Sequence, residues 1–233
     1  MKTSYVTRPT FFAPLLLLTL VALTGAACST APETATNTAR TNANAPAASP
    51  TMAANSNAND MQGMSGMDHS MMQSSPNATS APYDLQFIDT MSGHHQAAIE
   101  MARPAETKAQ HAELKELARN IIRDQEREIS QMKGWREQWF KDQPQAMNMA
   151  MPGMMDSMKG MDMTRLNAVT GNAFDLMFID MMTPHHQGAV AMAREALTRA
   201  EHPEVKKLAQ QIIDAQENEI AQMNKWKAAW GGE

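Results

Sequence analysis

Residues 83–102 read YDLQFIDTMSGHHQAAIEMA, and residues 174–193 read FDLMFIDMMTPHHQGAVAMA. The likeness continues without a gap, so that residues 83–139 recur as residues 174–230. Roughly half of the aligned positions are identical, which identifies a tandem duplication. Six of the seven histidines fall at matched places in the two copies. Because histidine and methionine are borderline and soft metal-ligand types, their presence at matched positions points to a metal-binding protein.

Each copy predicts two helices. In the first helix of copy one, apolar and histidine side chains recur at steps of three and four, which places them on one stripe: Phe87, Met91, His94, Ala98 and Met101. The second helix has heptad-like spacing from Leu114 to Trp139, repeated from Val205 to Trp230. Since one hairpin alone buries little apolar surface, we expect an all-α, ferritin-like four-helix bundle built from two tandem helical-hairpin repeats, residues 83–141 and 174–230.

Proline and glycine mark the expected irregularities of these helices. Pro104 disrupts the pattern in copy one, whereas Glu195 continues the helix in copy two. Gly93 and Pro184 precede the two histidine pairs, and both residue types weaken a helix, so we expect a kink or a restart there. His202 stands before Pro203 at the start of a helix. We therefore expect His202 and its counterpart His111 to serve the turn between helices.

The N-terminus has the features of an export signal. Lys2 and Arg8 precede an apolar run that is short for a membrane span, and small residues follow it up to Cys28. We expect residues 1–27 to be removed and Cys28 to be lipidated, giving a periplasmic lipoprotein of the cell envelope anchored in the outer membrane. Secretion after cleavage at Ala27, as a soluble periplasmic protein, is the alternative. The membrane is then a partner through the lipid anchor only.

Two methionine-rich segments lie outside the repeats. Residues 28–82 are poor in large aliphatic side chains, which predicts a flexible tether. Residues 142–173 form a linker in which Pro152, Gly153 and Gly160 argue against a regular helix. We expect both segments to supply loosely held thioethers to a metal. The candidate residues in them are Met61, Met64, Met67, His69, Met154 and Met158.

The net charge and the cysteine content limit the partners of the protein and the side chains that can bind a metal. The net charge of −5 disfavours nucleic acid as a partner. Cys28 is the only cysteine, so no internal disulfide forms and no thiolate site survives lipidation. The soft donors that remain are thioethers, and methionine is abundant at 23 residues.

The chemistry of the repeats follows from helical geometry. Adjacent histidines on a helix point about 100° apart, so we expect one of each pair to enter the core and the other to reach a neighbouring helix or the surface. Thioether and imidazole together suit Cu(I), Ag(I) and, through the histidines, Cu(II). The candidate metal ligands are Met91, His94, His95, Met101, Met132, Met182, His185, His186, Met192 and Met223, with Glu128 and Glu219 as secondary candidates. Core packing is an open alternative for the methionines, because Met fills irregular gaps.

The repeated Met, His-His-Gln and Met-Ala pattern resembles the bacterial "domain of unknown function 305" family. It is carried by Met91, His94, His95, Gln96, Met101 and Ala102, and by Met182, His185, His186, Gln187, Met192 and Ala193. The run from Gln125 to Trp135 and its copy from Gln216 to Trp226 also fit. The resemblance covers most of residues 83–230. It implies a ferritin-like helical bundle and an exported copper-binding protein that aids copper tolerance.

These residues are compatible with three functions. The first is an exported protein that sequesters or buffers copper, and silver as well, without turnover; it can exchange copper with an envelope protein and can form a homodimer. The second is a di-iron oxidase, an enzyme that needs Glu-x-x-His motifs, and no such motif occurs in this chain. The third is a structural or adaptor lipoprotein whose histidines are ordinary interior groups. The sequence favours the first.

Overall fold

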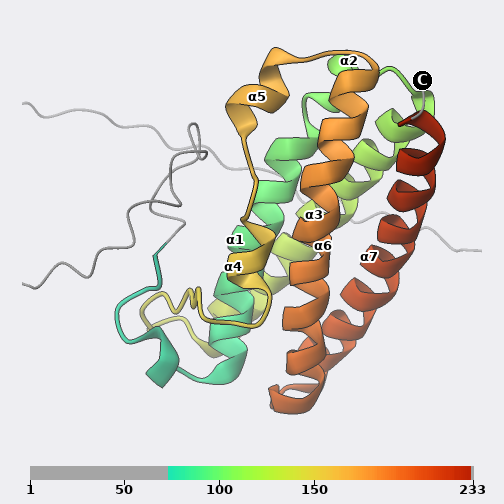
Figure 1. The fold of residues 1–233 in the computed structure, drawn as a ribbon. Coiled ribbons are helices and arrows are strands. Elements are labelled where there is room, and N and C mark those ends of the chain that lie inside the picture. The colour runs from blue at the N-terminus through green and yellow to red at the C-terminus, as the bar shows by residue number, and fades with distance from the viewer. Residues whose placement is uncertain (1–72, 232–233) are drawn as a thin grey trace, which may run out of the picture. The chain divides into compact units, whose positions relative to one another are not determined.

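The computed structural model describes residues 73–231, and this part of the chain is helical, with no β-strand. Four long helices dominate it: α1 (Tyr83–Ala102), α3 (Ala112–Trp139), α6 (Asn172–Arg199) and α7 (Pro203–Trp230). Three short helices, α2 (Ala105–Lys108), α4 (Met154–Ser157) and α5 (Met163–Ala168), and the 3₁₀ helix η2 (Ala78–Ser80) complete it. The all-α expectation is confirmed (Figure 1).

The long helices pair as the duplication predicts. In the first repeat α1 packs against α3, in the second α6 packs against α7, and the two repeats meet where α1 packs against α6. Thus α1 and α6 form the inner pair, and each carries one outer helix (Figure 1). The apolar stripes read from the sequence lie in one core, in which Phe87, Phe174 and Phe178 are fully buried.

Pro104 and Pro184 have different effects on the helices of the two repeats. In the first repeat α1 ends at Ala102, just before Pro104, and the chain continues through the short α2. In the second repeat α6 runs on past Glu195 to Arg199, as the sequence indicated. A helix restart at the histidine pairs was wrong: Gly93 lies inside α1 and Pro184 lies inside the continuous α6.

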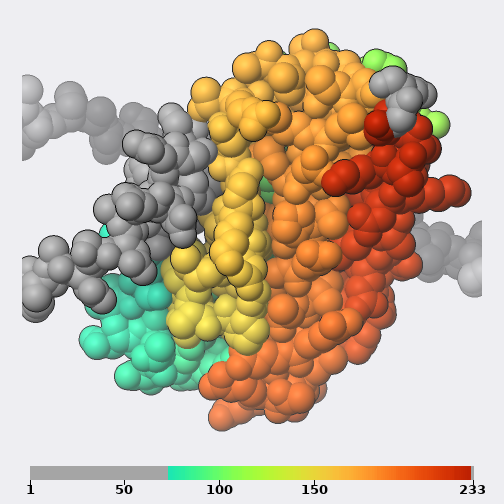
Figure 2. All heavy atoms as spheres, in the orientation of Figure 1, coloured from blue at the N-terminus to red at the C-terminus, as the bar shows by residue number. Residues whose placement is uncertain are grey.

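The linker between the repeats packs against the bundle, so the expectation of a loose segment was wrong. Its methionines are at most 6% exposed at six positions: Met147, Met149, Met151, Met154, Met158 and Met161. Side chains of α1 bind its backbone: Asp89 accepts from the amide of Ala146 at 2.8 Å, and Thr90 accepts from the amide of Asn148 at 2.8 Å. The linker lies along α6 (Figure 2).

A close backbone contact fixes α4 on α6. Gly153 caps α4 with φ of 79°, a left-handed conformation that glycine adopts without strain. A Cβ atom built on Gly188 of α6 would lie 2.4 Å from Cβ of Ser157 and 2.6 Å from the carbonyl oxygen of Gly153. The linker can therefore approach α6 this closely only because residue 188 has no side chain.

Candidate metal centre

Two histidines meet at the centre of the molecule. His94 of α1 and His185 of α6 are fully buried, and their ring centroids lie 3.7 Å apart with the planes tilted by 35°. The two residues occupy the same place in the two repeats, so the contact lies on the pseudo-twofold axis that relates the repeats. The stripe predicted for Met91, His94 and Met101 places this ring inside the bundle.

The central imidazoles have no partners. Among residues 73–231, neither ring nitrogen of His94 or His185 has a hydrogen-bond partner. Burial lowers the pKa of both histidines well below the ordinary value of 6.5, and electrostatic repulsion between the clustered imidazoles lowers it further. Both rings are therefore neutral at pH 7, and their lone pairs are available in a dry interior. A buried polar group without a partner is costly, and a metal ion would bind the nitrogen of each neutral ring that carries the lone pair.

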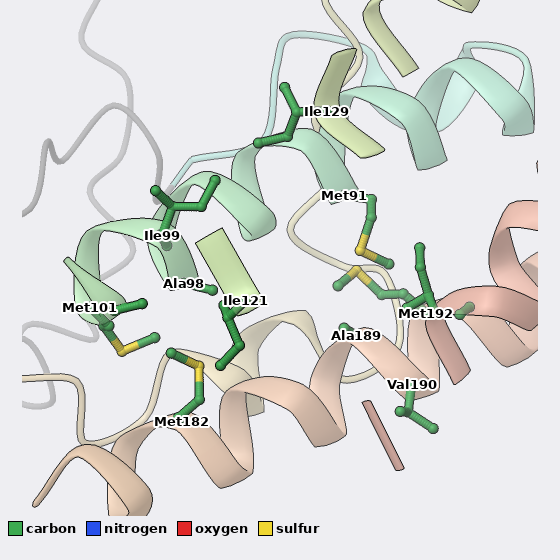
Figure 3. Close-up of a cluster of buried hydrophobic side chains, with 14 of the residues drawn as sticks. Met91, Ala98, Ile99, Met101, Ile121, Ile129, Met182, Ala189, Val190 and Met192 are labelled. Carbon is green, nitrogen blue, oxygen red and sulfur yellow. The ribbon is translucent and has the colours of Figure 1, made fainter. Parts of the chain in front are cut away.

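Methionine side chains flank this pair on both sides. Met91 and Met192 point toward one another, and so do Met101 and Met182 (Figure 3). All four are fully buried. Met91 precedes His94 by one helical turn and Met101 follows it by two, so one pair lies on each side of the histidines. The pairing of an early residue of α1 with a late residue of α6 shows that the two helices run antiparallel.

The second histidine of each box reaches the outer helix of its own repeat. Nε2 of His95 lies 2.8 Å from Oε2 of Glu128 on α3, and Nε2 of His186 lies 2.7 Å from Oε2 of Glu219 on α7. In the described part of the chain, Nδ1 of each ring has no hydrogen-bond partner and is buried. A carboxylate that accepts from Nε2 leaves the lone pair on Nδ1. The sequence correctly predicted that adjacent histidines diverge.

Among the described residues, the remaining candidate ligands are not part of the cluster formed by the central histidines and the four flanking methionines. Met132 and Met223, on α3 and α7, are fully buried. The hydroxyl of Ser92 approaches the sulfur of Met132 at 3.8 Å. Met154 and Met158 are buried in the packed linker. The other candidates lie outside the described residues: Cys28, Met61, Met64, Met67 and His69.

His111 and His202 lie away from the central histidines, at the ends of the bundle. They are the N-cap residues of α3 and α7, as the sequence suggested. Oδ2 of Asp175 lies 2.7 Å from Nδ1 of His111, and Trp230 stacks on the same ring at 3.8 Å. Asp84 binds His202 in the matching way, and Trp139 stacks on that ring at 3.9 Å. Each cluster joins one repeat to the other.

The side chains of the described residues restrict which donor atoms can hold a metal at this centre. Within residues 73–231, no three side chains of His, Cys, Asp or Glu form a group that could hold a metal ion. A metal held at the centre would therefore take thioether donors as well as imidazoles.

No helix among residues 73–231 is both long and apolar enough to cross a lipid bilayer.

The molecule is thus an all-α protein of two duplicated hairpins with histidine and methionine at its centre, and it belongs to the family described as domain of unknown function DUF305. The family model matches residues 23–136 and again residues 84–227. Residues 84–136 fall in both matches, as expected of a chain whose two repeats are alike.

Several solved structures are similar to this chain. CopM in its Cu(I)-bound form is 48% identical, with a TM-score of 0.54 over 63% of this chain and 96% of that one. CopM in its Cu(II)-bound form is 50% identical, with a TM-score of 0.55 over 63% and 97%. A putative secreted DUF305 protein from Streptomyces coelicolor is 30% identical, with a TM-score of 0.56 over 67% and 95%.

A curated relative adds little to this picture. Uncharacterized protein L153 of Acanthamoeba polyphaga mimivirus is 39% identical over 59 residues. That match spans 24% of this chain and 39% of the viral protein.

Proposed function

We propose that this protein binds Cu(I), and Ag(I) as a chemical analogue, between α1 and α6, and that it sequesters or buffers copper without turnover. One observation carries the proposal: four buried imidazole nitrogens, on His94 and His185, have no hydrogen-bond partner within residues 73–231. Buried thioethers flank them (Figure 3). Imidazole and thioether donors suit soft monovalent cations and, through the imidazoles, Cu(II).

The similar structures support this assignment. CopM, about half identical to this chain over the matched part, has Cu(I)-bound, Cu(II)-bound and Ag-bound forms. The ligands we assign are His94 and His185, with the thioethers of Met91, Met101, Met182 and Met192. Nδ1 of His95 and of His186 supplies a further donor on each side. Met132, Met223, Met154 and Met158 act as packing residues in this assignment.

The test compares the wild-type protein with the double variant His94→Leu/His185→Leu. Leucine removes the donors and also the unpartnered buried nitrogens, so the apo variant should be at least as stable as the wild type. Excess Ag(I) or Cu(I) should raise the melting temperature of the wild type, because a ligand selective for the native state stabilises it. The double variant should lose most of this rise.

Two results would contradict the proposal. An unchanged melting temperature of the wild type in excess Ag(I) and Cu(I) would favour an adaptor protein. An equal rise in the double variant would place the site elsewhere. Met155→Leu is the matched control, because Met155 is 58% exposed and lies outside the centre.

We also propose that the protein acts in the cell envelope, as a lipoprotein attached through Cys28. The export signal and the following single cysteine support this placement. Cys28→Ser should release the protein from the membrane fraction into the soluble periplasmic fraction. A wild-type protein that is already soluble would contradict the lipid anchor and leave export after Ala27.

A further inference from the structure

A groove of about 640 Å³ lies between the two outer helices, α3 and α7. Its lining includes Glu128 and Glu219, the two carboxylates that bind His95 and His186. The groove therefore comes within one side chain of the histidine centre from both repeats. The lining of the groove carries four carboxylates and two basic side chains: Asp124, Glu128, Glu204 and Glu219, with Arg127 and Lys207. Asp124 is paired with Arg127 at 2.7 Å, so the excess negative charge of the groove comes from the three glutamates.

Two glutamines on this lining have unpaired oxygens. Gln125 and Gln216 occupy matched positions in the repeats and are only 4% and 3% exposed. Within residues 73–231, Oε1 of each has no hydrogen-bond partner. Because an unpaired buried acceptor is costly, two of them at symmetric places on one groove indicate that the groove receives a cation.

Another hollow near the centre is less suited to a cation. It has a volume of about 470 Å³ and lies between α1, α3 and the linker, beside Ser92 and Gly93. Its charged lining is Asp89 against Lys133 and Arg136. On the α6 side, α4 packs directly on Gly188. Of these two hollows in the described part of the chain, the groove between α3 and α7 is therefore the one that attracts a positive ion.

We infer that the groove between α3 and α7 is the entrance through which the copper ion reaches the centre. This inference rests on the proposed function. The carboxylates concentrate the cation, and the amide oxygens of Gln125 and Gln216 hold it briefly. Oxygen donors bind a soft cation weakly, so the ion moves on to the imidazoles and thioethers below. A transit site must bind well enough to admit an ion and weakly enough to release it.

The test blocks the groove without touching the centre. Ala215 is an exposed residue of α7 that lines the groove, and Ala215→Trp should fill part of it. Ala221→Trp, at an exposed position of the same helix, is the matched control. The measurement is the rate at which Cu(I) passes from a chromophoric Cu(I) chelator to the protein, followed by absorbance, together with the copper bound at equilibrium.

Ala215→Trp should slow the transfer by about tenfold or more and leave the copper bound at equilibrium unchanged, while Ala221→Trp should match the wild type. Gln125→Leu/Gln216→Leu should also slow the transfer, because it removes the two transit oxygens and keeps the buried volume. Wild-type rates in both groove variants would overturn the entrance. A wild-type protein that takes up no copper would instead refute the proposed function, so the two failures are distinguishable.

Discussion

His94 and His185 are the residues at which folding and function conflict most. Burial keeps both rings neutral, and the described structure gives their nitrogens no partner. An apolar side chain of similar size would pack at this place without leaving lone pairs unpaired. The fold thus accepts a loss of stability in the metal-free state and offers one lone-pair nitrogen from each neutral ring to a soft cation.

The stability of the metal-free protein should fall as the pH falls below about 6.5. In the unfolded chain the two histidines take up protons near that pH, while in the folded protein burial holds their pKa well below it. The unfolded state then binds more protons, so the free energy of unfolding decreases by about 1.4 kcal/mol per pH unit for each histidine. Above that pH both states are neutral and the pair contributes no slope.

Urea denaturation of metal-free protein between pH 5 and 8 measures this slope. The variant His94→Leu/His185→Leu serves as the control, because it keeps every carboxylate that also titrates in acid. The difference in the free energy of unfolding between the two proteins should stay constant above pH 7 and change steadily toward pH 5, with the wild type losing stability relative to the variant. Parallel curves over the whole range would show that the central rings are protonated in the folded state.

Glu128 and Glu219 should act through the histidines that they bind. Glu128→Gln removes the carboxylate that accepts from Nε2 of His95 and lets the ring adopt the other tautomer. Loss of such a partner lowers metal affinity about 10- to 100-fold, and Glu219→Gln should do the same through His186. Competition titrations with Ag(I) measure the affinity, and the ¹⁵N chemical shifts of His95 report the tautomer.

Glu126→Gln is the matched control for this pair of variants. Glu126 is on the same helix but pairs with Arg103 at the surface, where its side chain is 53% exposed. It should leave both the Ag(I) affinity and the His95 tautomer unchanged. If Glu128→Gln behaves in the same way, the carboxylate does not position the ring.

Sequence spacing predicted the inward residues well, because helical periodicity is a local property. It placed His94 on the same stripe as Met91 and Met101, and it predicted that one histidine of each pair enters the core while the other reaches a neighbouring helix or the surface. It also placed His111 and His202 at helix starts. It did not predict the roles of Asp84 and Asp175, because each aspartate binds residues of the other repeat. Local sequence spacing contains no information on contacts between residues so far apart in the chain. Their one signal was an aspartate at the same early position in both copies.

At the scale of elements, the linker differs most from what its sequence indicated. Proline and glycine correctly predicted irregular backbone, and α4 is only four residues long. The order of the segment comes from distant residues instead. Asp89 and Thr90 of α1 bind its amides, and Gly188 of α6 lets it approach closely. A pattern confined to the segment contains none of these contacts.

Gly188→Ala should therefore destabilise the protein. The new methyl group would lie 2.4 Å from Cβ of Ser157 and 2.6 Å from the carbonyl oxygen of Gly153, so α4 must shift. Overpacking of this kind costs about 1–3 kcal/mol. Urea denaturation measures the change.

Gly134→Ala provides the control within α3, because a Cβ atom there meets nothing within 4 Å. Alanine forms helix more readily than glycine, so this variant should gain roughly 0.5–1 kcal/mol. A Gly188→Ala variant that is also stabilised would show that the linker does not pack on α6 as described.

At the scale of the whole molecule, the two repeats are interlocked at both ends as well as at the centre. Asp175 of the second repeat accepts from the amides of Gln110 and His111 in the first, and Asp84 of the first accepts from the amides of Glu201 and His202 in the second. Each repeat thus completes the start of a helix that belongs to the other. This reciprocity follows from the pseudo-twofold axis.

Thermal unfolding should therefore be a single cooperative transition in which both repeats melt together. Asp175→Ala removes the acceptor of three partly buried donors of the first repeat, the amides of Gln110 and His111 and Nδ1 of His111. A lost hydrogen bond to a charged group costs about 1.5–3 kcal/mol. The substitution should lower the melting temperature of the whole protein without splitting the transition. Calorimetry that resolved two transitions, with only one displaced by Asp175→Ala, would contradict the interlock.

In the proposed function, imidazole and thioether groups hold a soft cation between the two repeats. Crystals of the protein loaded with Cu(I), measured at the copper absorption edge, test it most directly through the anomalous difference density. Density is expected between α1 and α6, at coordination distance from a ring nitrogen of His94 or His185 and from at least one of the flanking methionine sulfurs. Density confined to the surface or the linker, with the central rings still unligated, would contradict it.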